Sequence, residues 1–243
     1  MKRLHFLLMI VVSYWIQFQP AQAQSTIFNV PSADPTPKGQ VMLESESQFR
    51  PWKPGAYYDG TEYSTLGIGH NTELACTVIN ITSPAEHITG LAPGFKSCIP
   101  ILAQKFKERE FKVTVGEMVP IQIEGHSSVG SWTFGHLSGR IPVLKTRITA
   151  GVSAGTRQIF GRNAVSFIGA YEQPITKRLA LQGDWFSGTN FLGYFIPGCS
   201  YVLPGNFILY AGYQIPNSRR VGRSGLVLEL QRYFPLVKTT KGP

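Results

Sequence analysis

Two stretches of the sequence place a histidine two residues before a serine, His126-x-Ser128 and His136-x-Ser138. Residues two apart share one face of a β-strand, so each imidazole could accept the hydroxyl proton and make the serine a nucleophile for lipid hydrolysis. The spacing occurs twice, and the sequence assigns no third group that would orient either histidine. We therefore expect no catalytic residues, and a lipid hydrolase or deacylase that uses His126 and Ser128 is kept as an alternative.

Three cysteines, Cys76, Cys98 and Cys199, occur without a CxxC motif or a Cys/His spacing typical of a metal site. The sequence also contains no P-loop and no GxGxxG turn followed by a helix. We therefore expect neither a metal nor a cofactor. If the chain is exported, Cys76 and Cys98 could form a disulfide, and three unpaired cysteines in strands are the equal alternative.

The elements that must position these residues are β-strands, because apolar residues recur with a period of two. Between 40 and 49, Val41, Leu43 and Phe49 share one face, and Glu44 and Glu46 share the other. Turn residues separate twelve stretches of this kind. The expected strands are 39–49, 61–69, 72–80, 97–105, 111–123, 128–137, 144–156, 164–173, 178–187, 191–203, 206–215 and 225–234.

Longer and shorter connections largely alternate between these strands. The longer ones are 50–60, 81–96, 157–163 and 216–224, and the shorter ones include 70–71 and 106–110. An even number of strands with long and short connections at opposite ends is typical of a membrane barrel. We predict an all-β fold, an antiparallel up-and-down transmembrane β-barrel with about 12 strands, with about 10 as the alternative.

The composition favours a membrane barrel over a soluble one. Of the 243 residues, 43% are hydrophobic and only 15% are charged, against roughly 25% in soluble domains. A soluble barrel turns its polar strand faces to water, where Lys and Glu should be abundant. Here those faces consist mostly of Gln, Ser, Thr, Tyr and Gly, which suits a lumen. A soluble secreted β-barrel carrier remains the alternative.

The first 23 residues have the features of a secretory signal peptide. Lys2 and Arg3 precede an apolar stretch at 4–16, and Ala21-Gln22-Ala23 has the form of a cleavage site. An apolar stretch of about 13 residues is too short to span a bilayer as a helix. We predict export and cleavage after Ala23.

These features divide the chain into four segments. The domain prediction is a signal peptide at 1–23, a periplasmic segment at 24–38, the barrel at 39–234 and a C-terminal tail at 235–243.

The net charge of +9 is dispersed over loops, and export separates the chain from nucleic acid. We therefore expect no nucleic-acid partner.

Several blocks in the second half resemble a family of predicted bacterial outer-membrane β-barrel proteins that are described as porin-like or transporter-like. The blocks are Glu172-Gln173-Pro174-Ile175-Thr176-Lys177, Asp184-Trp185-Phe186-Ser187-Gly188, Gly193-Tyr194-Phe195-x-Pro197-Gly198 and Leu209-Tyr210-Ala211-Gly212-Tyr213-x-Ile215. Near the N-terminus, Asn29-x-Pro31-Ser32 and Pro37-Lys38-Gly39 resemble the same family. The resemblance implies the fold and an outer-membrane location, and it implies no catalytic residue.

The last strand carries a second resemblance. Leu226-x-Leu228-x-Leu230, leading to Tyr233-Phe234, is similar to the C-terminal recognition signal of outer-membrane barrels. That similarity implies the barrel-assembly machinery as a partner during insertion. The tail at 235–243 departs from the pattern, because the signal usually ends the chain.

Two sets of residues could carry the function. The lumen candidates lie on polar strand faces, where they would select small solutes by charge or fill a narrow barrel; they are Glu44, Glu46, Gln182, Asp184, Gln214, Glu229 and Gln231. If the C-terminus is periplasmic, five arginines at the outer rim could pair with lipopolysaccharide phosphates; they are Arg157, Arg162, Arg219, Arg220 and Arg223. We predict a barrel among outer-membrane lipids, either a narrow passive channel for small solutes or an envelope structural barrel.

Overall fold

The computed structural model describes residues 26–51, 57–82, 87–124, 128–161 and 164–236. Among the described residues the helices are short, and the architecture is built from strands. Within the described residues, no helix combines the length and the apolar character that crossing a membrane requires. The predicted signal peptide at 1–23 lies outside this part of the chain.

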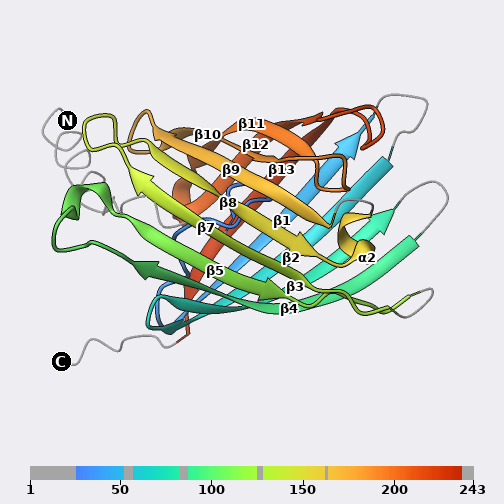
Figure 1. The fold of residues 1–243 in the computed structure, drawn as a ribbon, viewed down its shortest axis with the longest axis horizontal. Helices are drawn as coiled ribbons and strands as arrows, with labels where there is room; N and C mark the ends of the chain where they lie inside the picture. Colours follow the sequence, from blue (N-terminus) through green and yellow to red (C-terminus); the bar gives the residue numbers. More distant parts are fainter. Residues whose placement is uncertain (1–25, 52–56, 83–86, 125–127, 162–163, 237–243) are drawn as a thin grey trace, which may run out of the picture.

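Twelve strand units form one closed antiparallel barrel (Figure 1). The two-residue strand β6 counts with β5, because both pair with β4 in one register and only Val119 and Pro120 separate them. Pro120 has no N–H to donate, which interrupts the ladder there. The bounds are β1 (Gln40–Arg50), β2 (Tyr57–Gly69), β3 (Thr72–Thr82), β4 (His87–Pro100), β5 (Lys112–Met118), β6 (Ile121–Gln122), β7 (Trp132–Arg140), β8 (Arg147–Gly155), β9 (Val165–Pro174), β10 (Leu179–Phe186), β11 (Tyr194–Val202), β12 (Phe207–Pro216) and β13 (Gly225–Pro235).

Pairing between the first and last strands closes the barrel. Gln40 of β1 lies opposite Pro235 of β13, and Phe49 lies opposite Leu226. β3 pairs with both β2 and β4, so every strand unit has two neighbours. A closed sheet has no exposed edge. The predicted all-β antiparallel barrel of about 12 strands is therefore confirmed, and the alternative of 10 is not.

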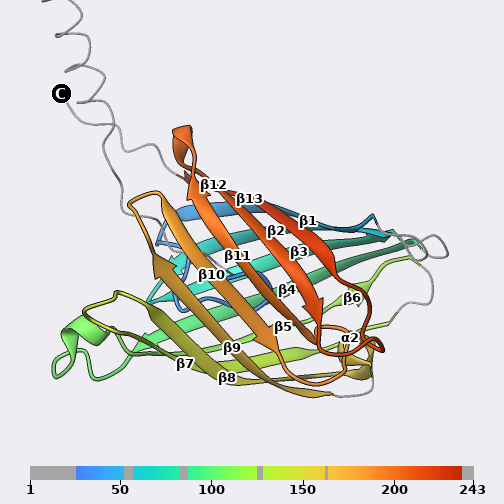
Figure 2. The same cartoon turned by 90° about the horizontal axis from the view of Figure 1, so that it is seen from above.

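The two ends of the barrel differ. At the terminal end, where β1 begins and β13 ends, the connections are mostly short, as between β2 and β3 at 70–71. The exception is 101–111, which contains the 3-10 helix η1 (Lys107–Arg109). At the opposite loop end lie the longer connections and the short helix α2 (Arg157–Phe160). Figure 2 shows α2 at the end opposite the β9–β10 and β11–β12 turns.

Strand alternation in this barrel is inverted relative to a soluble protein. In β13, Leu228 and Leu230 point outward and are 41% and 42% exposed, whereas Glu229 between them is 1% exposed. The exposed aliphatic side chains give the barrel an apolar outer surface, and the polar side chains line its lumen. This arrangement is the one that a lipid-embedded barrel requires.

The largest difference from the expected strands concerns β4. The sequence predicted a long connection at 81–96 and a strand at 97–105, because Gly90, Pro93 and Gly94 are typical of turns. In the structure β4 already includes these residues. A Cβ on Gly94 would lie 2.3 Å from the Glu117 carbonyl oxygen, so this glycine permits close strand contact rather than a turn.

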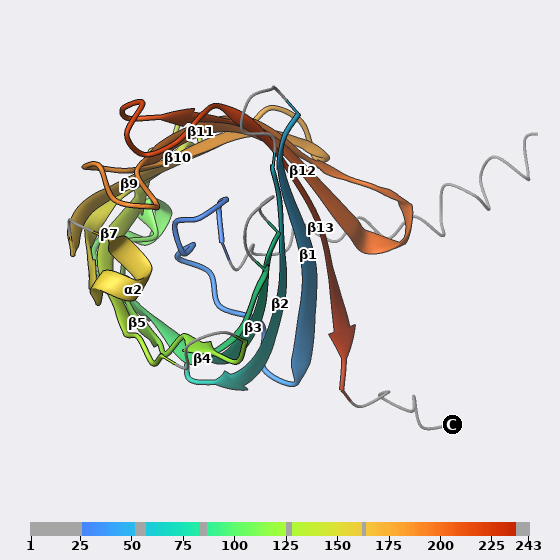
Figure 3. The same ribbon diagram turned by 90° about the vertical axis from the view of Figure 1, so that its right-hand side faces the viewer.

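The N-terminal segment corrects a second expectation. Residues 24–38 were expected to be periplasmic, but from Thr26 onward the structure places them inside the barrel. Figure 3 shows this blue segment within the ring of strands. Ile27, Phe28 and Val30 are at most 1% exposed. We call residues 26–38 the plug segment. A barrel of this width is wider than side chains alone fill, so a chain segment supplies the missing volume.

Candidate functional site in the barrel lumen

All seven lumen candidates point into the barrel and are at most 2% exposed: Glu44, Glu46, Gln182, Asp184, Gln214, Glu229 and Gln231. Their placement follows from strand alternation, which puts every second residue of β1, β10, β12 and β13 on the inner face. The lumen is therefore lined by amides and carboxylates, and the plug segment lies against them.

Three of the glutamates form the predicted polar cluster. Glu46 of β1 lies directly opposite Glu229 of β13, and Glu44 lies opposite Gln231. Gln231 donates from Nε2 to Glu44 at 2.9 Å, and the Tyr63 hydroxyl donates to Glu46 at 2.8 Å. Among the described residues, neither carboxylate oxygen of Glu229 has a hydrogen-bond partner. The cluster is thus a partly bonded acidic patch on the lumen wall.

The tip of the plug segment, residues 27–30, is a tight turn wrapped around a carboxylate. The Ile27 amide donates to the Val30 carbonyl at 2.8 Å. Oδ2 of Asp184 accepts the backbone N–H groups of Phe28 at 3.2 Å and of Asn29 and Val30 at 2.6 Å each. Successive amides around one anion form a strong site, because each hydrogen bond is assisted by charge. Asp184 therefore anchors the tip.

The barrel wall is also shaped to receive the tip. Gly198 and Gly212 lie opposite each other on β11 and β12. A Cβ on Gly198 would lie 2.6 Å from Cζ of Phe28, and one on Gly212 would lie 2.9 Å from Cε1 of Phe28. The phenyl ring thus occupies a recess that only paired glycines provide. Phe28 and Ile27 belong to the apolar cluster that includes Ile196, Tyr210 and Val227.

The base of the plug segment, residues 32–37, is held by polar groups. The Thr36 amide donates to Glu73 at 2.5 Å, and Glu73 forms an ion pair with Lys96 at 3.2 Å. Lys96 also donates to the Asp34 carbonyl at 3.3 Å. A Cβ on Gly67 would lie 2.1 Å from the Pro37 carbonyl oxygen, so the wall again makes room for the segment.

Asp34 joins the base to a group of charges that we call the terminal ionic cluster. Its carboxylate pairs with Lys112 of β5 and Arg147 of β8. Arg147 also approaches Glu110 at 3.3 Å and Glu172 at 3.7 Å. Burial raises the pKa of Asp34, but the charges of Arg147 and Lys112 outweigh burial and lower this pKa to about 2. Asp34 is therefore ionised at neutral pH.

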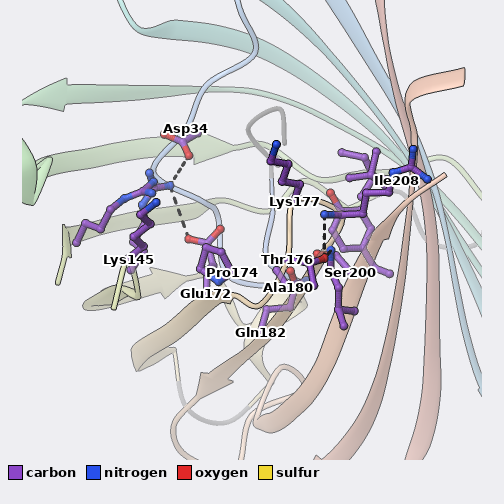
Figure 4. A pocket seen from close by; sticks show the side chains of 16 residues that line it. Asp34, Lys145, Glu172, Pro174, Thr176, Lys177, Ala180, Gln182, Ser200 and Ile208 are labelled. Carbon is purple, nitrogen blue, oxygen red and sulfur yellow. Dashed lines mark hydrogen bonds and ion pairs between the residues drawn. The ribbon is translucent and has the colours of Figure 1, made fainter. Parts of the chain in front are cut away.

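Beside Asp34, at the terminal end, lies a cavity of about 310 Å³. Figure 4 shows Asp34, Lys145 and Glu172 around it, together with Lys177 from the β9–β10 turn. Arg140, Arg147 and Arg178 also contribute to the wall. The cavity is therefore a largely basic entrance next to the carboxylate of the plug segment.

Of the two His-x-Ser pairs considered for lipid hydrolysis, only His136 and Ser138 lie wholly within the described residues. His126 lies outside the described residues, and the Ser128 hydroxyl donates to Gln122 at 3.1 Å. His136 and Ser138 both face the lumen and are at most 4% exposed, but within the described chain their side-chain nitrogen and oxygen atoms have no hydrogen-bond partner. His136 and Ser138 are therefore not hydrogen-bonded to each other.

Three further sequence expectations concern cysteines, metals and arginines. Cys76, Cys98 and Cys199 are unpaired, so the disulfide alternative does not hold. The described residues contain no group of His, Cys, Asp or Glu side chains that could hold a metal. Four of the five rim arginines lie in the loop-end connections, namely Arg157, Arg219, Arg220 and Arg223. The fifth, Arg162, lies outside the described residues.

Sequence reasoning missed Asp34, Glu73, Lys96, Lys112 and Arg147. One signal could have revealed Glu73, because it is the only charged residue in the expected strand 72–80. Such a charge faces the lumen, where water or a counter-ion is available. Asp34 lies outside the strands and carried no comparable signal.

Comparison with known proteins supports the fold. No protein-family model and no curated protein matches the chain. Among solved structures, the chain is similar to a KdgM porin in complex with disordered oligogalacturonate, with a TM-score of 0.54 and 11% identity over 80% of this chain and 99% of that one. A KdgM porin matches with a TM-score of 0.53 and 14% identity over the same shares. The protein therefore shares the closed barrel fold of these porins. At this level of identity, the similarity concerns the fold alone.

Proposed function

We propose that the protein is an integral outer-membrane channel, a narrow passive path for small solutes that the plug segment constricts. The observation that carries the proposal is a closed barrel with an apolar outside and a polar inside, as Leu228, Glu229 and Leu230 illustrate. Such a wall suits lipid on one side and hydrated solute on the other. The fold shared with KdgM porins supports a channel over a soluble carrier.

In this proposal, the signal peptide at 1–23 is removed after Ala23, and the barrel-assembly machinery inserts the barrel with its terminal end toward the periplasm. The loop end then faces outward. An envelope structural barrel is the second candidate, and the hydrogen bonds that fix the plug segment to Asp184 and Glu73 favour it.

Fractionation and electrophysiology on the full-length protein separate these candidates. We expect the protein in the outer-membrane fraction, with heat-modifiable mobility on gels, and small conductance steps in planar bilayers. A soluble carrier would remain in solution without detergent. A structural barrel would be folded and membrane-bound, but neither the wild type nor a variant with a loosened tip of the plug segment would conduct. That result would overturn the channel proposal.

The loop-end arginines are proposed to bind lipopolysaccharide phosphates. Replacing Arg219, Arg220 and Arg223 by Gln should lower the amount of lipopolysaccharide that co-purifies with the barrel, because guanidinium groups pair with phosphate through two parallel hydrogen bonds. The matched control changes three basic residues at the terminal end, Lys105, Lys107 and Arg109, to Gln. Equal lipopolysaccharide retention by both triple variants would contradict the assignment.

A further inference from the structure

The terminal ionic cluster is balanced only when the plug segment is in place. Its ion pairs join three cations, Lys112, Arg140 and Arg147, to three carboxylates, Asp34, Glu110 and Glu172. Five of these six residues belong to the barrel wall or to the connection at 101–111, and only Asp34 belongs to the plug segment. Without Asp34, the remaining five residues carry one excess positive charge.

The two cations that contact Asp34 have the form of an anion site. Lys112 and Arg147 converge on one carboxylate from strands β5 and β8, and the Arg147 side chain is only 7% exposed. Nε of Arg147 has no hydrogen-bond partner within the described part of the chain. A partly desolvated guanidinium with a free donor beside a lysine is suited to a carboxylate, since Arg binds carboxylates through a planar fork.

The base of the plug segment can release Asp34 without exposing a large apolar side chain. Residues 32–34 are Ser, Ala and Asp, and the Asp34 amide donates to the Ser32 hydroxyl at 3.3 Å. The cavity of about 310 Å³ borders Asp34, Arg147 and Lys145, so a small solute can reach the site from the terminal end.

We propose that Arg147 and Lys112 form a binding site for the carboxylate of a small acidic solute, and that Asp34 is a tethered occupant which such a solute displaces. Exchanging one carboxylate for another preserves the charge balance of the cluster. The bound solute would displace the base of the plug segment while the tip stays anchored on Asp184. This inference rests on the proposed channel function and assigns the plug segment a role in gating it.

Calorimetry on the folded, detergent-solubilised full-length protein tests the site with succinate as the probe and succinamide as the neutral control. Asp34→Asn should bind succinate at least about tenfold more tightly than wild type, because a competing tethered carboxylate lowers apparent affinity by the fraction of sites it occupies. The matched control is Asp59→Asn, which makes the same substitution on β2, away from the plug contacts. Adding Arg147→Gln to Asp34→Asn should abolish the gain.

A second measurement does not depend on Asp34→Asn. Ser32 is fully buried, so Ser32→Cys, with the native cysteines replaced by Ser, should react with a maleimide faster when succinate is added and unchanged when succinamide is added. Equal succinate affinity in wild type and folded Asp34→Asn, or an equal gain in Asp59→Asn, would overturn the site. Succinate binding without conductance in any variant would instead overturn the channel and leave the site standing.

Discussion

The tip and the base of the plug segment are held in one lumen by different interactions. At the tip, Phe28 fills a recess between two glycines, and Asp184 accepts three backbone N–H groups. At the base, Asp34 and Thr36 are held by ion pairs and by one carboxylate, Glu73. Apolar burial is lost when the tip leaves, whereas a carboxylate from solution can replace the contacts of Asp34. The tip is therefore a permanent anchor and the base an exchangeable one.

The largest effect is expected at the tip. Phe28→Ala should cost about 3–5 kcal/mol of the free energy that holds the segment, because the change empties a recess that the wall cannot refill. Planar-bilayer recordings should show larger or more frequent openings. The matched control is Phe167→Ala, which truncates a phenylalanine on the outer surface that is 68% exposed. Equal conductance in Phe28→Ala and wild type would mean that the tip does not restrict the lumen.

A smaller effect should follow from Asp184→Asn, which keeps an acceptor oxygen but removes the charge. The three amides of residues 28–30 would then lose charge-assisted hydrogen bonds, at a cost of about 1–3 kcal/mol. We expect openings of intermediate frequency and faster hydrogen exchange at those amides. Unchanged exchange rates at Phe28, Asn29 and Val30 would show that the charge of Asp184 is not what anchors the tip.

The sequence predicted the barrel wall well and the contents of the lumen poorly. The wall follows from local periodicity, whereas the contents of the lumen depend on contacts between residues far apart in the chain. In β10 and β13, polar residues recur at every second position, so the inward positions of Gln182, Glu229 and Gln231 followed from a period of two. In β4, Gly90, Pro93 and Gly94 were interpreted as turn residues because the neighbouring strand that requires Gly94 is not visible in a linear sequence.

The plug segment has no period that would predict where it lies. Its apolar residues, Ile27, Phe28 and Val30, were the available signal, since a periplasmic linker has no reason to carry them. Their partners come from β10, β11 and β12, more than 150 residues later in the chain for the contacts with Asp184. Pairing over such a separation is decided by closure of the barrel and not by local sequence.

The smallest effect is expected at the base and depends on pH. The pKa of Asp34 is lowered from 3.8 to about 2 by Arg147 and Lys112, although burial opposes this shift, so the ionised carboxylate favours the docked segment. That contribution is complete above a pH of about 4 and is lost as the pH falls from about 4 to about 2. One pKa unit corresponds to about 1.4 kcal/mol, and partial exposure to water reduces the gain, so we expect at most about 2 kcal/mol.

Conductance of the wild-type protein should therefore rise as the pH falls through this window, and Asp34→Asn should conduct at a higher level that does not change there. Phe28→Ala should keep the pH dependence, because it alters the tip and leaves the ion pairs of Asp34 intact. If Asp34→Asn retained the wild-type pH profile, another group would control the opening, and the base would be as permanent an anchor as the tip.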